Sequence, residues 1–121
     1  MTRPTIAITM GDPAGIGLEV IMKALVKPET RAICNALVIG DANRLRKAGK
    51  IVGERLEIDA LREADDANFA SGTVQCLDLN LVPDDLPFGE MSAAAGEAAY
   101  RFIERAVQVV QAGSAQAICT A

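Results

Sequence analysis

Short apolar runs alternate along the chain with segments in which apolar residues recur every three or four positions. The apolar runs predict strands at residues 5–10, 36–39, 57–59, 74–79 and 115–120. The segments with helical spacing predict helices at residues 15–25, 42–48 and 93–112. Strands that alternate with helices favour an α/β fold around a mostly parallel sheet.

The ends of the predicted helices carry recognisable capping residues. Asp41 is the predicted N-cap of the 42–48 helix, and Gly49 is its predicted stop. Ser92 is the predicted N-cap of the longest helix, which Gly113 ends. Residues 82–90 contain two prolines and a glycine, so we expect an irregular connection there.

Two helical patterns also predict which side chains face the core. In the first helix these are Ile16, Val20, Met22, Ala24 and Leu25. In the longest helix they are Ala95, Ala99, Phe102, Ile103, Ala106, Val107 and Val110.

The first strand runs into the turn Gly11-Asp12-Pro13-Ala14-Gly15-Ile16-Gly17, and a helix follows directly. Ligands of α/β proteins usually bind where a strand ends and a helix begins. Backbone N–H groups at a helix start also favour anions. We therefore predict that this turn is part of an active-site wall, with the candidate cofactor-binding residues Gly11, Asp12, Gly15 and Gly17.

Two better-known glycine loops and a turn without a ligand are the alternatives. A Walker A loop needs a lysine after its last glycine, but Leu18 and Glu19 follow Gly17. A dinucleotide fingerprint would use Gly15 and Gly17, with Asp41 binding a ribose, but residues 11–14 make the turn longer than that motif. Asp12 itself fits a ligand-facing role and a turn-capping role equally well.

Composition removes several classes of function. Half of the residues are apolar, only four are aromatic, and the net charge is −4 with interspersed signs, which argues against a nucleic-acid partner. The apolar runs are too short to span a membrane, and the N-terminus lacks an export signal. Cys34, Cys76 and Cys119 match neither a disulfide framework nor a zinc ribbon. We expect a reduced, cytoplasmic protein with Cys76 and Cys119 buried in strands.

The chain contains no histidine, which is the commonest acid–base residue and transition-metal ligand. Its sixteen carboxylates mostly fall where solvated charges belong. Only Asp12 lies in a turn that suits a ligand.

Three segments resemble the 4-hydroxythreonine-4-phosphate dehydrogenase family. ITMGDPAGIGLE (residues 8–19) is similar to its N-terminal signature, although Leu18 stands where a proline is common. FGEMSAAAGEAA (residues 88–99) resembles the family's Gly-x-x-Ser-x-x-x-Gly entry to a long helix. AQAICTA (residues 115–121) resembles the strand that continues into a Pro-x-x-Lys motif. The likeness spans essentially the whole chain.

This resemblance implies a two-domain α/β enzyme, related in fold to isocitrate and isopropylmalate dehydrogenases, that acts as a homodimer. Such enzymes oxidise a phosphorylated hydroxy acid with NAD or NADP, and decarboxylation follows. They use a divalent metal (Zn, Mg or Co) held by histidines. Because this chain has no histidine, we assign no catalytic residue and no metal ligand within it. The implied substrate is 4-phosphohydroxy-L-threonine, in pyridoxal phosphate (vitamin B6) biosynthesis. The alternative is D-threonate or D-erythronate 4-phosphate, in sugar-acid catabolism.

Residues 1–121 are therefore expected to be the N-terminal α/β portion of a longer dehydrogenase, inactive alone. The predicted last strand ends where a ligand crevice should begin, which supports this expectation. A non-catalytic binding module with the same fold is the alternative.

Overall fold

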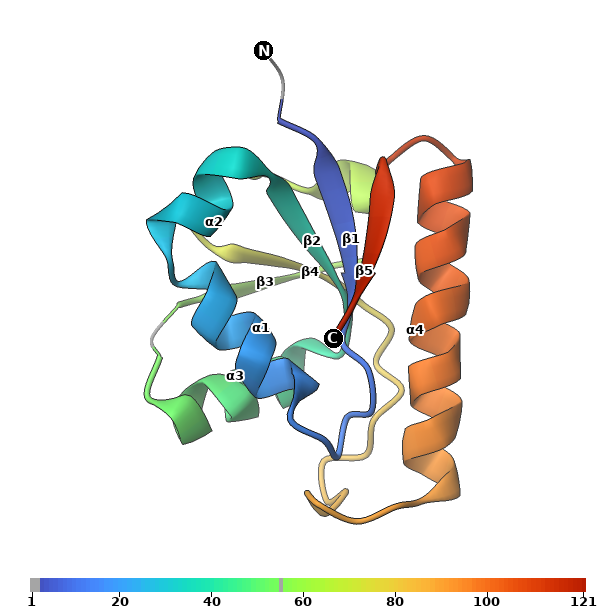
Figure 1. Ribbon diagram of the computed structural model, residues 1–121. Helices are drawn as coiled ribbons and strands as arrows, with labels where there is room; N and C mark the ends of the chain where they lie inside the picture. Colours follow the sequence, from blue (N-terminus) through green and yellow to red (C-terminus); the bar gives the residue numbers. More distant parts are fainter. Residues whose placement is uncertain (1–2, 55) are drawn as a thin grey trace.

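The computed structural model describes residues 3–54 and 56–121 (Figure 1). Its strands are β1 (Thr5–Thr9), β2 (Asn35–Gly40), β3 (Ile58–Leu61), β4 (Val74–Asp78) and β5 (Ala117–Thr120). Its α-helices are α1 (Gly17–Leu25), α2 (Pro28–Ile33), α3 (Ala42–Val52) and α4 (Ala93–Gln111), and a 3-10 turn covers Ala64–Asp66.

The five strands form one parallel sheet in the order β3-β4-β2-β1-β5. In Figure 1, α1, α2 and α3 cover one face of this sheet and α4 covers the other. The core lies between these layers, where Leu37, Val38 and Ile39 of β2 are almost completely buried. The predicted α/β fold with a parallel sheet is confirmed.

Most strand bounds agree with the prediction within two residues, but the helices between β1 and β3 differ more. The short helix α2 was not predicted; Pro28, which stops α1, occupies its first turn. Helix α3 continues beyond the predicted stop to Val52, and Gly53 (φ +75°) forms its left-handed C-cap. Gly49 lies inside α3 because α1 packs there: a Cβ atom on Gly49 would meet Met22 Cε at 3.2 Å.

The predicted core faces of α1 and α4 are partly wrong. Helix α1 buries Leu18, Ile21, Met22 and Leu25. Two residues expected to be buried, Ile16 and Val20, remain exposed. Helix α4 buries Ala95, Ala98, Phe102, Ala106 and Val109.

Ile103 and Val107 of α4 were also expected in the core, but they are 46% and 40% exposed. The apolar stripe of α4 is wider than the strip that touches the sheet, so its flank stays in solvent. The opposite flank carries Arg105, which lies 3.5 Å from Glu63 after β3. The apolar flank therefore points toward the β5 edge of the sheet.

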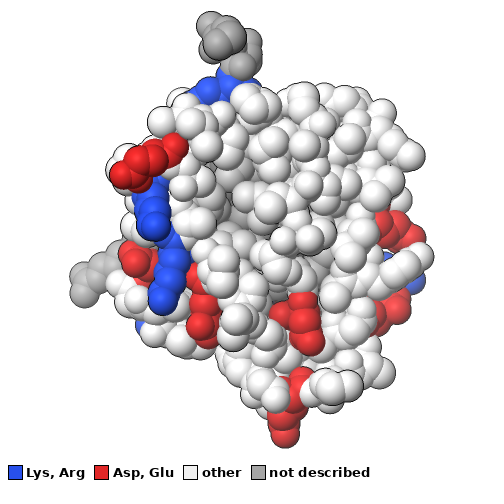
Figure 2. Space-filling model, viewed as in Figure 1, with Lys and Arg blue, Asp and Glu red and all other residues white. Residues whose placement is uncertain are grey.

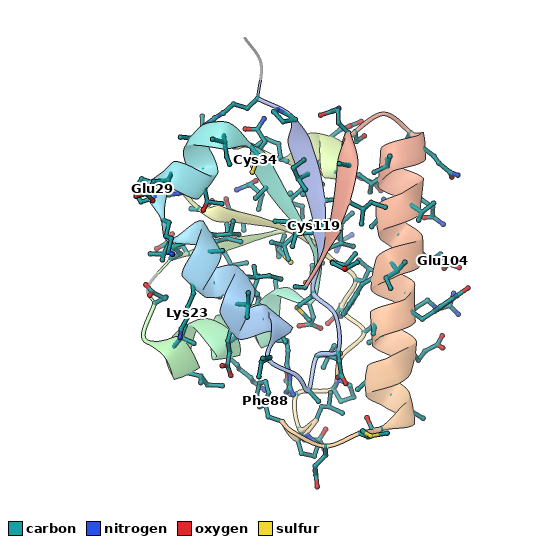
Figure 3. All side chains as sticks on the ribbon, in the orientation of Figure 1. Lys23, Glu29, Cys34, Phe88, Glu104 and Cys119 are labelled. Carbon is teal, nitrogen blue, oxygen red and sulfur yellow. The ribbon has the colours of Figure 1, made fainter. Side chains whose placement is uncertain are left out.

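Strand β5 was expected to be buried, but it is the edge strand and all four of its residues are exposed. Cys119, expected to be buried, is exposed with them on this edge (Figure 3). The surface around β5 carries few charged side chains (Figure 2). Among the described residues, no helix is long and apolar enough to cross a membrane.

The exposures of two neighbouring residues on α4 predict different mutational costs. Phe102→Ala removes a completely buried ring and should lower the free energy of unfolding by about 3–5 kcal/mol. Ile103→Ala, the matched control on the exposed flank, should lower it by less than about 1 kcal/mol. Urea denaturation of both variants measures the difference. Equal losses would contradict the observed orientation of α4.

The cysteines predict a burial-dependent pattern of alkylation. Burial raises the pKa of the Cys76 thiol, and the carboxylates of Asp78 and Asp41 raise it further. Iodoacetamide at mildly alkaline pH should therefore modify Cys119 in the folded protein and Cys76 only after unfolding. Peptide mass spectrometry with and without urea tests this order. Equal native rates for both thiols would refute it.

Candidate functional site

The glycine turn follows β1 at the carboxyl edge of the sheet. The neighbouring strands hold the end of β1 from both sides. Met10 N–H donates to the Ile39 carbonyl of β2 at 3.0 Å, and Ala121 N–H donates to the Thr9 carbonyl at 3.2 Å. The turn therefore lies at the edge where parallel sheets usually bind ligands.

Gly11 and Gly17 occupy positions where the structure leaves little room for a side chain. Gly11 has φ +74°, and a Cβ atom there would approach the Ala121 carbonyl oxygen at 2.6 Å. A Cβ atom on Gly17 would lie 3.0 Å from the Met10 carbonyl oxygen and 3.2 Å from the Ala121 carbonyl carbon. These glycines permit close approach between the turn and the chain that follows β5.

Asp12 has the turn-capping role in this structure. Its Oδ1 accepts a hydrogen bond from Ala14 N–H at 2.8 Å, and its carbonyl accepts one from Gly15 N–H at 2.9 Å. The residue is exposed. This is an Asx turn, which fixes the backbone between β1 and α1. All four predicted cofactor-binding residues thus lie in one ordered turn, and their contact with a ligand stays a prediction.

Asp41 is buried, and backbone groups occupy both of its carboxylate oxygens. Oδ1 accepts from Arg44 N–H at 2.9 Å, which confirms the predicted N-cap of α3. Oδ2 accepts from Val82 N–H at 3.3 Å. A carboxylate used in this way does not offer a ribose-binding group, so the arrangement argues against the dinucleotide-fingerprint alternative.

Arg44 of α3 is a site residue that the sequence did not predict. It is only 2% exposed. Its Nε donates to the Pro13 carbonyl of the glycine turn, and its Nη1 donates to the Leu86 carbonyl, both at 2.8 Å. The guanidinium carbon lies 3.6 Å from the centre of the Phe88 ring. Phe88 is labelled in Figure 3, beside the start of α1.

The electrostatic surroundings of Arg44 combine burial with two carboxylates. Burial lowers the pKa of the guanidinium, while Asp41 and Asp12 oppose this effect. Arginine stays protonated despite such a shift, so a positive charge is held beside the turn. One signal in the sequence could have pointed to Arg44. It lies one helical turn before Ala48, which is buried, and therefore on the same side of the helix.

Within residues 3–54 and 56–121, no three His, Cys, Asp or Glu side chains cluster closely enough to hold a metal ion. A groove of about 390 Å³, lined in part by Arg3, Arg31 and Asn35, lies at the amino ends of the strands. It is therefore at the opposite end of the sheet from the glycine turn, and we assign it no role in this site.

Comparison with known proteins identifies the family. A family model described as pyridoxal phosphate biosynthetic protein PdxA matches residues 32–121. The chain belongs to the PdxA family. This confirms the resemblance seen in the sequence.

Individual relatives also match the part that precedes residue 32. The D-threonate 4-phosphate dehydrogenase of Cupriavidus necator is 52% identical over 98% of this chain and 35% of its own length. A putative D-threonate 4-phosphate dehydrogenase of Oceanobacillus iheyensis is 39% identical over 98% of this chain and 36% of its own.

A crystal structure of a 4-hydroxythreonine-4-phosphate dehydrogenase from Burkholderia phymatum is 51% identical, with a TM-score of 0.96. The match covers 99% of this chain and 36% of the Burkholderia phymatum chain. The chain thus spans about a third of the length of the relatives it matches.

The close approach at Gly11 predicts a cost for any side chain there. Gly11→Ala should lower the free energy of unfolding by at least about 1–2 kcal/mol, because its positive φ disfavours L-residues and its Cβ meets the Ala121 carbonyl. Gly96→Ala is the matched control inside α4, where nothing lies within 4 Å. That change should raise stability by up to about 1 kcal/mol. Urea unfolding distinguishes the two, and an unaffected Gly11→Ala protein would contradict the geometry.

Proposed function

We propose that this chain is the N-terminal α/β part of a dehydrogenase that oxidises a 4-phosphorylated hydroxy acid with NAD or NADP. The observation that carries the proposal is the 52% identity over 98% of the chain with a D-threonate 4-phosphate dehydrogenase. The remaining part of the proposed enzyme supplies a second domain, and the active form is a homodimer. The three free thiols fit a cytoplasmic protein.

D-threonate 4-phosphate is the substrate that we propose first. The relatives from Cupriavidus necator and Oceanobacillus iheyensis both carry this substrate in their names. The alternative is 4-phosphohydroxy-L-threonine in vitamin B6 biosynthesis, supported by the name of the 51% identical Burkholderia phymatum protein. The two compounds differ at C2, where one has a hydroxyl group and the other an amino group.

The glycine turn forms part of the cleft wall in this proposal. Helix α1 begins at Gly17, and the side chain of its N-cap residue, Ile16, makes no hydrogen bond to the N–H groups there. Such a helix start favours an anionic group of the cofactor or the substrate. The nicotinamide cofactor, when bound, supplies the hydride acceptor, and this wall helps to hold and orient the reactants.

A divalent metal (Zn, Mg or Co) would need ligands from outside these residues. The described part of the chain lacks a suitable cluster, and the sequence has no histidine. No step of the reaction is therefore assigned to a metal held by this chain alone.

Turnover by the longer protein that contains this chain tests the proposed function. Reduced nicotinamide is measured with each of the two substrates, with NAD and NADP, and with each metal after chelation. We expect kcat/KM for D-threonate 4-phosphate to exceed that for 4-phosphohydroxy-L-threonine by at least about tenfold, or ~1.4 kcal/mol. The 121-residue chain is the control, and we expect it to be inactive.

The opposite substrate preference would support the vitamin B6 alternative. Absence of turnover with both compounds, under all metal and cofactor conditions, would refute the proposal.

A further inference from the structure

Arg44 joins two segments that are distant in sequence at the proposed cleft wall. We propose that it is a positioning residue: it fixes the glycine turn (residues 11–17) by tying it to the strap, which we define as residues 82–91. The turn and the strap then keep or lose their order together. The consequence of this coupling for ligand binding rests on the proposed function, but the coupling itself does not.

The two hydrogen bonds of the guanidinium diverge from one buried group. Nε reaches the Pro13 carbonyl, 31 positions earlier, and Nη1 reaches the Leu86 carbonyl, 42 positions later. Both carbonyls belong to irregular segments that lie outside the strands and helices. A planar group with several fixed donors can serve two carbonyls in different directions at once, whereas a lysine ammonium on a flexible chain is a single point charge.

Helix α3 holds the strap at three points spaced along one side of the helix. Asp41 Oδ2 accepts from Val82 N–H at 3.3 Å, Arg44 donates to Leu86, and Lys47 Nζ donates to the Asp84 carbonyl at 2.6 Å. Of these three side chains, only Arg44 also bonds to the glycine turn. It is therefore the link between α3, strap and turn.

Phe88 and Gly89 complete the connection from the strap. The Phe88 ring lies against the guanidinium at 3.6 Å, close enough for a cation–π interaction and for shielding from water. Gly89 N–H donates to the Ala14 carbonyl at 2.8 Å, directly beside the Pro13 carbonyl that Arg44 uses. Without Arg44, one direct hydrogen bond between strap and turn, from Gly89 N–H to the Ala14 carbonyl, is left among the residues that the structure describes.

Amide hydrogen exchange of the intact protein, followed by mass spectrometry, tests the coupling. Arg44→Met keeps most of the apolar stem but removes both hydrogen bonds. We expect it to speed exchange at least about tenfold in both the turn and the strap. Arg46→Met is the matched control on the same helix, because Arg46 bonds to Asn43 and the Ile58 carbonyl and not to either segment. It should leave exchange in both segments unchanged.

Three further measurements separate positioning from a general loss of stability. In Arg44→Ala, guanidinium chloride at millimolar concentration should restore slow exchange in both segments, whereas sodium chloride at equal ionic strength should not. Phe88→Leu, which leaves Arg44 and the fold in place, should speed exchange in the same two segments to a smaller extent. In the longer enzyme, Arg44→Lys should raise KM at least about tenfold with little change in kcat.

Faster exchange in the strap with an unchanged turn would overturn the proposal, as would failure of guanidinium to restore protection. A protein with coupled exchange but no dehydrogenase activity would refute the proposed function and leave the role of Arg44 intact. Dehydrogenase activity with an unchanged KM in Arg44→Lys would refute the effect on ligand binding alone.

Discussion

At the carboxyl ends of β1 and β2, the main chain and one buried side chain pack so closely that glycine is required. A Cβ atom on Gly11 would meet the carbonyl after β5, and one on Gly40 would lie 2.7 Å from the Cβ of Met10. Met10 is completely buried, so it has no free space into which it could withdraw. This tight packing determines where β1 can end and therefore where the turn and α1 can begin.

The positive charge of Arg44 lies at the same edge of the sheet. Neutral carbonyl groups contact this charge directly, whereas the carboxylates lie farther away. Within the described part of the chain, Arg44 makes no ion pair at hydrogen-bonding distance. It bonds to two carbonyls and packs on an aromatic ring, and two carboxylates act on its charge from a longer distance. Removing a guanidinium from water is costly, and each of these contacts offsets part of that cost. Conversely, the strap has no regular secondary structure of its own, so its conformation depends on groups presented by α3.

Local signals in the sequence were sufficient for the five strands, for three of the four α-helices and for the caps at Asp41 and Ser92, because each depends on residues a few positions apart. They did not indicate the short helix α2. The glycine turn was also recognisable from its composition. Gly49 was assigned the wrong role, because it allows contact with Met22 of another helix. Arg44 was missed for a similar reason: its partners lie 31 and 42 positions away. The exposure of β5 depends on the strand order, which local patterns do not specify.

The strand order also has a consequence for the way the chain folds as it is synthesised. Strand β1 is the first strand made, yet it lies between β2 and β5. Its pairing with β2 joins Thr5 to Asn35, so this part of the sheet can form early. The other side of β1 can pair only after β5 has been synthesised. Near the start of this pairing, the Thr5 N–H donates to the Gln116 side chain, 111 positions later. The edge of β1 that pairs with β5 therefore stays unpaired in the nascent chain until residues 117–120 have been made, so the order of synthesis limits the order in which this sheet can form.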